Sequence, residues 1–229
     1  MQFLQNSTKG KRLFVGIAAA ATLALPLAAC GSTSDSNVSS SSAKASVAKP
    51  AASIDALTGE DTAILLDTGF TDALTSLKLT PGVTGDAKLT DGSLVFPITG
   101  GNVTYFKPGT ASPYVIGQIQ HEGSGLSLTA GDTKVELTNL NVDPGVSRVY
   151  GDVSLNGETV VNSAYLFTLN GSTLKPLQAS GSTAVLEGTK VFISPVAAAL
   201  LNSTFKTDAV TEDLLVGIAK ITVNTTSGD

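Results

Sequence analysis

Short runs of alternating apolar and polar residues, separated by turn signals, constrain the fold more than any other feature of this sequence. One run spans residues 94–98, and another spans 149–155 and ends at Asn156-Gly157, a dipeptide typical of two-residue hairpins. Alternation with period two places one face of a strand in the core and leaves the other in solvent. The sequence therefore predicts a mainly β fold, either an antiparallel β-sandwich or a partly open barrel.

Irregularities in two of the runs predict where strands bend or end. The apolar positions of residues 135–142 change phase near Asn139, which predicts a β-bulge there. Residues 115–120 are predicted to form a strand that leads up to His121. The glycine-rich stretch 123–125 that follows is predicted to be a turn between two strands.

Two segments interrupt the strands with helical spacing of apolar residues. They cover about residues 68–79 and 195–205, and each follows an apolar strand. Ser194 is a good N-cap for the second helix, and Asp67 stands at the equivalent place before the first. A turn is predicted at Pro81-Gly82, after the first helix. We interpret the two strand–helix–strand segments as a pseudo-repeat at the two ends of the domain.

The N-terminus carries an export signal. Residues 1–29 combine three basic residues with an apolar run, and they end next to Cys30 in a Leu-Ala-Ala-Cys sequence that resembles a bacterial lipobox. We expect Cys30, the one cysteine of the chain, to be lipidated after cleavage. Residues 30–53 are then a Ser/Ala-rich flexible tether, and 54–229 form a single β-rich domain. The protein is expected to be lipid-anchored at the outer face of the bacterial cytoplasmic membrane.

Composition excludes several function classes. The chain has 14 Lys and Arg against 19 Asp and Glu, a net charge of −5, and no basic stripe, so nucleic-acid binding is not expected. A single Cys and a single His rule out a disulfide framework and Cys- or His-rich metal centres, so no metal site is predicted.

Asp67-Thr68-Gly69 is the sharpest catalytic motif. With the apolar residues before it, it resembles the active-site segment of retropepsin-like aspartic proteases, in which two aspartates share a proton and activate water. The pseudo-repeat places Ser194, not a second aspartate, at the equivalent position. The alternative interpretation is that Asp67 and Ser194 are both helix N-caps.

Three residues are candidates for binding a ligand. His121 is the one histidine, and it could act as a base, a ligand of a metal or haem, or a turn residue. Tyr105 and Tyr114 are candidates beside it, because a tyrosine near His121 could complete a haem site.

Four segments together resemble the HtaA-type domain. They are Phe70–Leu74, then Asp91-Gly-Ser-Leu-Val-Phe-Pro-Ile-Thr-Gly-Gly, then residues 116–128, which contain Gln-His-Glu-Gly-Ser-Gly, and then 135–153. The resemblance covers about residues 60–155. It implies an extracytoplasmic β-rich domain of the kind found on actinobacterial surface proteins, several of which bind haem. It places His121 where that family has a histidine that supports the haem site. The family's haem-ligating tyrosine falls in the Phe70–Leu74 stretch, which holds neither tyrosine nor arginine.

The sequence thus predicts an envelope lipoprotein with a non-enzymatic binding or interaction domain. Its partners are expected to be the membrane, through the lipid on Cys30, and a small apolar ligand, with haem as one candidate cofactor. The alternatives are an aspartic hydrolase built on Asp67 and a purely structural or adhesive envelope protein.

Overall fold

In the computed structural model, residues 47–225 can be described, and strands dominate them. The predicted signal peptide and Cys30 lie outside the described residues. The strands are β1 (Ala52–Ile54), β2 (Glu60–Leu66), β3 (Thr80–Gly85), β4 (Lys88–Thr90), β5 (Ser93–Pro97), β6 (Gly100–Tyr105), β7 (Val115–Ala130), β8 (Thr133–Asp143), β9 (Arg148–Leu155), β10 (Glu158–Asn170), β11 (Gln178–Ser180), β12 (Thr183–Ile193) and β13 (Leu215–Asn224). The helices are α1 (Thr68–Ser76) and α2 (Pro195–Phe205), with a short 3₁₀ turn at Gly171–Thr173.

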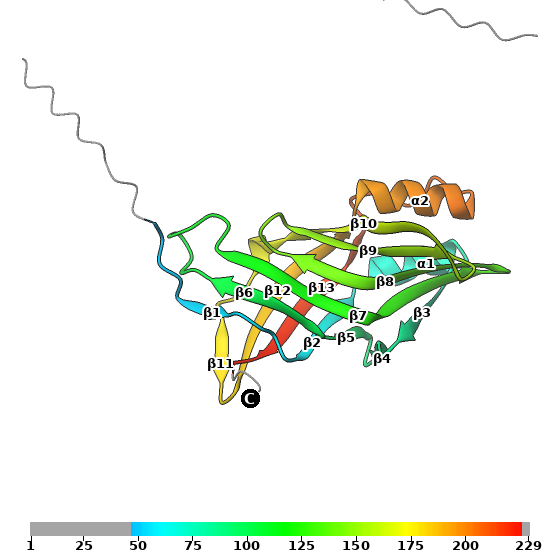
Figure 1. The fold of residues 1–229 in the computed structure, drawn as a ribbon. Coiled ribbons are helices and arrows are strands. Elements are labelled where there is room, and N and C mark those ends of the chain that lie inside the picture. The colour runs from blue at the N-terminus through cyan, green and yellow to red at the C-terminus, as the bar shows by residue number, and fades with distance from the viewer. Residues whose placement is uncertain (1–46, 226–229) are drawn as a thin grey trace, which may run out of the picture. The chain divides into compact units, whose positions relative to one another are not determined.

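All the strands belong to one antiparallel sheet that curls on itself (Figure 1). Its order is β1-β6-β7-β8-β9-β10-β12-β13-β2-β5-β4, with β3 pairing the far half of β7 and β11 pairing β12. The predicted partly open barrel is confirmed. A sandwich of two separate sheets is not formed, because β10, β12, β13 and β2 continue the hydrogen-bonded path without a break.

The curl nearly closes because β5 and β6 lie near opposite ends of the strand order yet are consecutive in the chain. Thr99, between them, donates its backbone N–H to the carbonyl of Gln120 on β7 at 2.8 Å. Its side-chain oxygen accepts the N–H of Glu122 at 2.9 Å. The sheet therefore wraps around one interior, which is lined largely by Leu, Val, Ile and Phe side chains.

Both predicted helices form, and both begin at a side-chain cap. The Asp67 carboxylate accepts the N–H of Gly69 at 2.8 Å, and the Ser194 hydroxyl accepts the N–H of Ala197 at 3.0 Å. Helix α2 has the predicted bounds and packs on β10, as Figure 1 shows. Helix α1 ends at Ser76, three residues before the predicted end, because Lys78 adopts a positive φ of 55°.

Two turn predictions are wrong, because the residues concerned lie inside strands. Pro81 lies inside β3, which is an edge strand, where a residue without an N–H is tolerated. The stretch 123–125 is not a turn either, since β7 runs unbroken from Val115 to Ala130 and His121 is inside it. The glycines there accommodate a bulge, and the register with β8 shifts between His121 and Gly125.

The predicted bulge near Asn139 is confirmed, and it is one of a set. The register of β8 with β9 shifts between Thr138 and Asn141, and Asn139 has a positive φ of 52°. The bulges of β7 and β8 shift the buried apolar side chains between odd and even numbers in both strands, as Ile119 and Leu126 show in β7 and Leu137 and Leu140 in β8. Since these two neighbouring strands change phase at the same level, their apolar side chains stay turned inward on both sides of the bulges.

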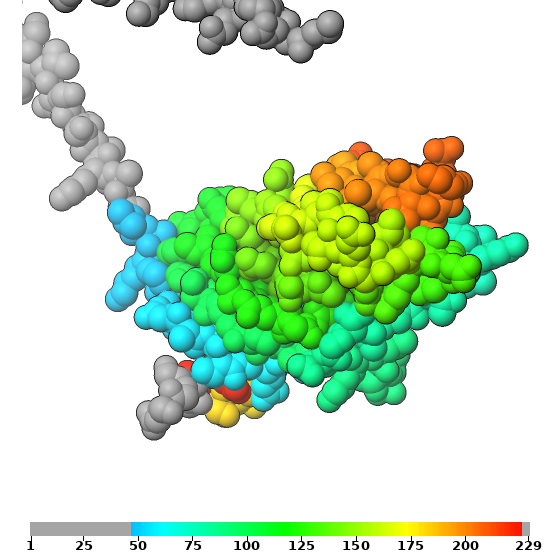
Figure 2. Space-filling view, turned by 45° about the vertical axis from the view of Figure 1, so that its right-hand side comes forward, coloured from blue at the N-terminus to red at the C-terminus, as the bar shows by residue number. Residues whose placement is uncertain are grey.

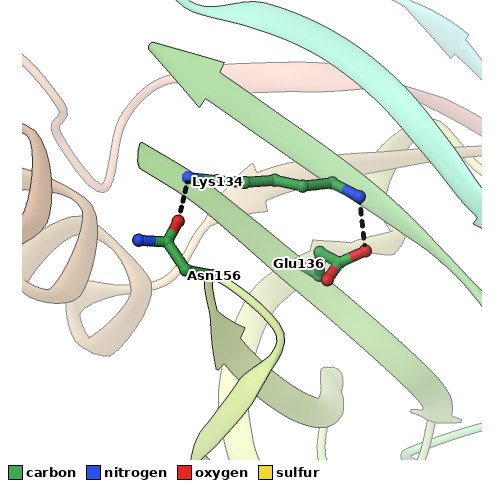
Figure 3. A network of polar contacts seen from close by, with 3 residues as sticks. All are labelled: Lys134, Glu136 and Asn156. Carbon is green, nitrogen blue, oxygen red and sulfur yellow. Dashed lines mark hydrogen bonds and ion pairs between the residues drawn. The ribbon is translucent and has the colours of Figure 1, made fainter. Parts of the chain in front are cut away.

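The predicted hairpin at Asn156-Gly157 connects β9 to β10 and is anchored to β8 (Figure 3). The Asn156 side chain accepts the N–H of Lys134 at 2.7 Å, and the Lys134 ammonium pairs with Glu136 at 2.8 Å.

The N-terminal edge of the sheet begins earlier than the sequence indicates. Ala52 and Ser53, assigned above to the end of the tether, pair with Tyr105 and Thr104 of β6. Among residues 47–225, no helix is long and apolar enough to cross a membrane.

Candidate functional site

The curled sheet surrounds a partly open apolar cavity of about 440 Å³. Ten strands contribute residues to its wall, including Thr62, Phe96, Ile119 and Leu140 from the middle of the sheet. None of the described residues that line it is Asp, Glu, Lys or Arg. The polar groups of the wall are hydroxyls and the His121 ring, so the cavity offers hydrogen bonds without charge.

His121 lies in this wall and is 1% exposed. Its Nδ1 is 3.2 Å from the carbonyl oxygen of Leu140, and its Nε2 is 2.8 Å from the hydroxyl of Thr62. A carbonyl oxygen can only accept, so Nδ1 carries the proton in the neutral ring. Nε2 then accepts from the Thr62 hydroxyl, and both ring nitrogens have a partner.

Burial keeps the His121 ring neutral. Desolvation lowers the pKa of His121 from 6.5 to about 4, against the smaller opposing effect of hydrogen bonds to the backbone at Leu140 and Ile119. The Phe96 ring packs edge-on against it, with centroids 6.2 Å apart. At neutral pH the one histidine of the chain is therefore an uncharged, fully bonded part of the wall.

Tyr105 and Tyr114 lie together where β6 leads into β7. Their rings make an edge-to-face contact with centroids 6.1 Å apart, both are half-buried, and both line the cavity. Burial raises the pKa of the Tyr114 phenol, and the neighbouring Tyr105 raises it further. Tyr114 directly precedes β7 and lies seven positions before His121, which corresponds to about 23 Å of extended strand. The three predicted residues thus share one cavity but occupy two distant parts of it.

Asp67 is not among the cavity residues. Its carboxylate caps α1, and its backbone N–H donates to the carbonyl of Val216 at 2.9 Å. Ser194 caps α2 and also donates to the carbonyl of Tyr165 at 2.6 Å. The interpretation of both residues as N-caps is therefore confirmed. Within residues 47–225, no group of three or more His, Cys, Asp or Glu is placed to hold a metal ion.

Sequence reasoning missed the partner of His121. Thr62 is 4% exposed and sits in β2, 59 residues away, and its position beside His121 depends on the closure of the sheet. No local pattern marks it, because Thr62 differs in no way from other threonines in predicted strands.

No family model matches the chain, and no curated protein matches it in sequence. Among solved structures, it is similar to the C-terminal domain of HtaA from Corynebacterium glutamicum, at 12% identity and a TM-score of 0.47, over 75% of this chain and 98% of that one. It is also similar to a domain-swapped dimer of a histidine-to-alanine variant of the same domain, at 12% identity and a TM-score of 0.43, over 69% and 90% of the two chains. What the cavity can bind follows from the residues of this chain.

Proposed function

We propose that this protein is an exported envelope lipoprotein whose β-rich domain binds a neutral, apolar small molecule inside the curled sheet and catalyses no reaction. The observation that carries the proposal is the cavity of about 440 Å³, which has no charged residue among the described residues of its wall. Ligand sites of about 300–1,000 Å³ hold small molecules, and a wall of this kind favours a ligand without formal charge.

The anchor is proposed from the N-terminal sequence. The lipobox-like sequence ends at Cys30, and acylation there would hold the protein at the outer face of the cytoplasmic membrane. Mass spectrometry of the protein from its native membrane tests this, with Cys30→Ser as the control. Release of the Cys30→Ser protein into the soluble fraction is the expected result, and unchanged membrane association would contradict it.

Haem is the ligand that the HtaA-type resemblance implies, and the described residues do not fit it. Both nitrogens of His121 are already bonded, and the pKa of Tyr114 is shifted away from the phenolate that would bind ferric iron. The two residues lie too far apart along β7 to share one iron. None of the wall residues within 47–225 is a Lys or Arg that could pair with propionates. We therefore expect haemin to give no Soret change that depends on His121.

Ligand binding in the cavity is tested by a substitution that fills the cavity with a larger side chain. Ile64 and Leu65 are neighbours on β2, but Ile64 lines the cavity whereas Leu65 is 56% exposed on the other face. The full chain is kept in a detergent at a concentration below the critical micelle concentration of that detergent. The neutral dye phenylnaphthylamine is then titrated into it, and the fluorescence of the dye is recorded. We expect saturable binding at one site in the wild type and in Leu65→Trp, and at least about tenfold weaker binding in Ile64→Trp.

Equal binding by the two variants, or no saturable binding by the wild type, would overturn the proposal. Unfolding midpoints of both variants are measured alongside. If Ile64→Trp does not fold, the shorter change Ile64→Phe is titrated in its place against Leu65→Phe.

A further inference from the structure

The outer face of the same strands carries a row of polar and aromatic side chains. The register pairs Gln120 with Asn141, Asn141 with Tyr150 and Tyr150 with Tyr165, across β7, β8, β9 and β10. Residues paired directly across antiparallel strands share one face. We call these four residues the outer row. The next pair, His121 with Leu140, is buried on the opposite face.

Three members of the outer row line a polar depression of about 520 Å³, together with Glu122, Asn139 and Asp152. Figure 2 looks onto the green to yellow-green surface that β7–β10 form, with α2 in orange above it. No Lys or Arg lines the depression among the described residues, so it does not attract an anion.

The floor of the depression is fixed by a chain of hydrogen bonds over the bulges. The N–H of Gly123 donates to the Asn139 side chain at 3.0 Å, and Asn139 donates to Asp152 at 2.9 Å. Asp152 also accepts the N–H of Ser163 at 2.9 Å. Four strands are thereby joined, and the carboxylate of Asp152 is used for structure.

Asn141 differs from Asn139 and Asp152 in its hydrogen bonding. Its side-chain oxygen is buried and has no hydrogen-bond partner within residues 47–225. Asn141 itself is half-buried in the wall of the depression, so a ligand hydroxyl there meets the rest of its side-chain amide and not this shielded oxygen.

The aromatic part of the row stands beside this acceptor. The rings of Tyr150 and Tyr165 are 6.0 Å apart. Arg148 covers Tyr165 at 4.5 Å from the ring centroid and reaches the Tyr150 hydroxyl at 3.5 Å. Tyr150 is the ring that borders the depression itself.

We propose that this depression binds a neutral saccharide unit of a polysaccharide, separately from the cavity. A sugar ring presents several hydroxyl donors and acceptors together with an apolar C–H face. The amides of Gln120 and Asn141, with the carboxylate of Glu122, match the hydroxyls, and the Tyr150 ring matches the C–H face. The carboxylates of Glu122 and Asp152, with no Lys or Arg among the described residues of the lining, favour an uncharged sugar over a phosphorylated or sulfated one.

The full chain is tested by affinity electrophoresis in gels that contain dextran, mannan or arabinogalactan. We expect retardation by at least one of these neutral polysaccharides. Tyr150→Ala should weaken that interaction about tenfold or more, and Asn141→Ala about threefold to tenfold. Tyr105→Ala, which removes a cavity tyrosine, is the matched control and should bind as the wild type does.

Tyr150→Phe separates the ring from its hydroxyl and should keep most of the affinity. Intrinsic tyrosine fluorescence gives a second readout, since the chain has four Tyr and no Trp. Absence of retardation in all three gels would overturn the proposal, as would equal binding by folded Tyr150→Ala protein. Phenylnaphthylamine binding should persist in Tyr150→Ala, because the cavity is a different site.

Discussion

The two faces of β7 to β10 make opposite surfaces from adjacent residues. Gln120 points to the outer polar depression, whereas its neighbour His121 is buried in the wall of the apolar cavity. On the inner face even the one histidine, His121, is neutral. On the outer face, amides, carboxylates and the Tyr150 ring line the depression. Strand alternation, kept in phase by the bulges of β7 and β8, therefore gives one sheet an uncharged interior and a hydrogen-bonding exterior.

A carboxylate placed on each face is expected to give the largest contrast. Ile119 is 3% exposed, so Ile119→Asp should lower the free energy of unfolding by about 3–5 kcal/mol, because an unpaired charge is buried. Gln120→Asp, one residue along on the outer face, should change it by less than about 1 kcal/mol. Urea unfolding monitored by circular dichroism measures both, and similar losses at the two positions would contradict the contrast between the faces.

The neutral state of His121 predicts a pH dependence of stability. The unfolded chain takes up a proton on His121 near pH 6.5, and the folded chain only near pH 4. The unfolded state therefore binds more protons between these values, so stability falls as pH is lowered through this window, by about 3 kcal/mol. Above pH 6.5 this group contributes no slope.

The contribution of His121 is isolated by comparison with His121→Gln, which keeps one donor and one acceptor but does not titrate. We expect the fall in unfolding free energy from pH 6.5 to 4 to be smaller in His121→Gln. Parallel pH profiles for the two proteins would show that His121 is not held neutral by burial.

Removing a hydrogen bond acceptor from the bulges of the outer face should lower the free energy of unfolding by a smaller amount. Asp152→Ala removes two hydrogen bonds, to Ser163 and Asn139, and is expected to cost about 2 kcal/mol of unfolding free energy. Glu158→Ala, at an exposed position beside the hairpin, is the control and should be near neutral. If Asp152→Ala lowered the free energy of unfolding no more than Glu158→Ala does, the hydrogen bonds of Asp152 would not stabilise the bulges.

The sequence predicted the parts of the fold that local chemistry determines. Helix α2 follows from Ser194 as a cap with Pro195 behind it, and the Asn156-Gly157 hairpin follows from its dipeptide. The phase change near Asn139 was visible as a shift of apolar positions. For the equivalent change in β7 the sequence predicts a turn, because Gly123 and Gly125 are as typical of a turn as of a bulge.

The sites were less accessible to sequence reasoning, because they depend on register. His121, Tyr105 and Tyr114 were identified as candidates, and all three line the cavity. The pairing of His121 with Thr62 and the alignment of Gln120, Asn141 and Tyr150 join residues from separate strands. Neither can be inferred before the strand order is known.

The central claim is that the cavity selects ligands without charge, and one pair of dyes tests it most directly. Phenylnaphthylamine and anilinonaphthalene sulfonate share the same ring framework, but only the second carries a negative charge. Titrated into the wild-type chain at neutral pH, the neutral dye should bind at least about tenfold more tightly. Equal or tighter binding of the sulfonate, lost in Ile64→Trp, would show that the cavity accepts an anion and would contradict the account.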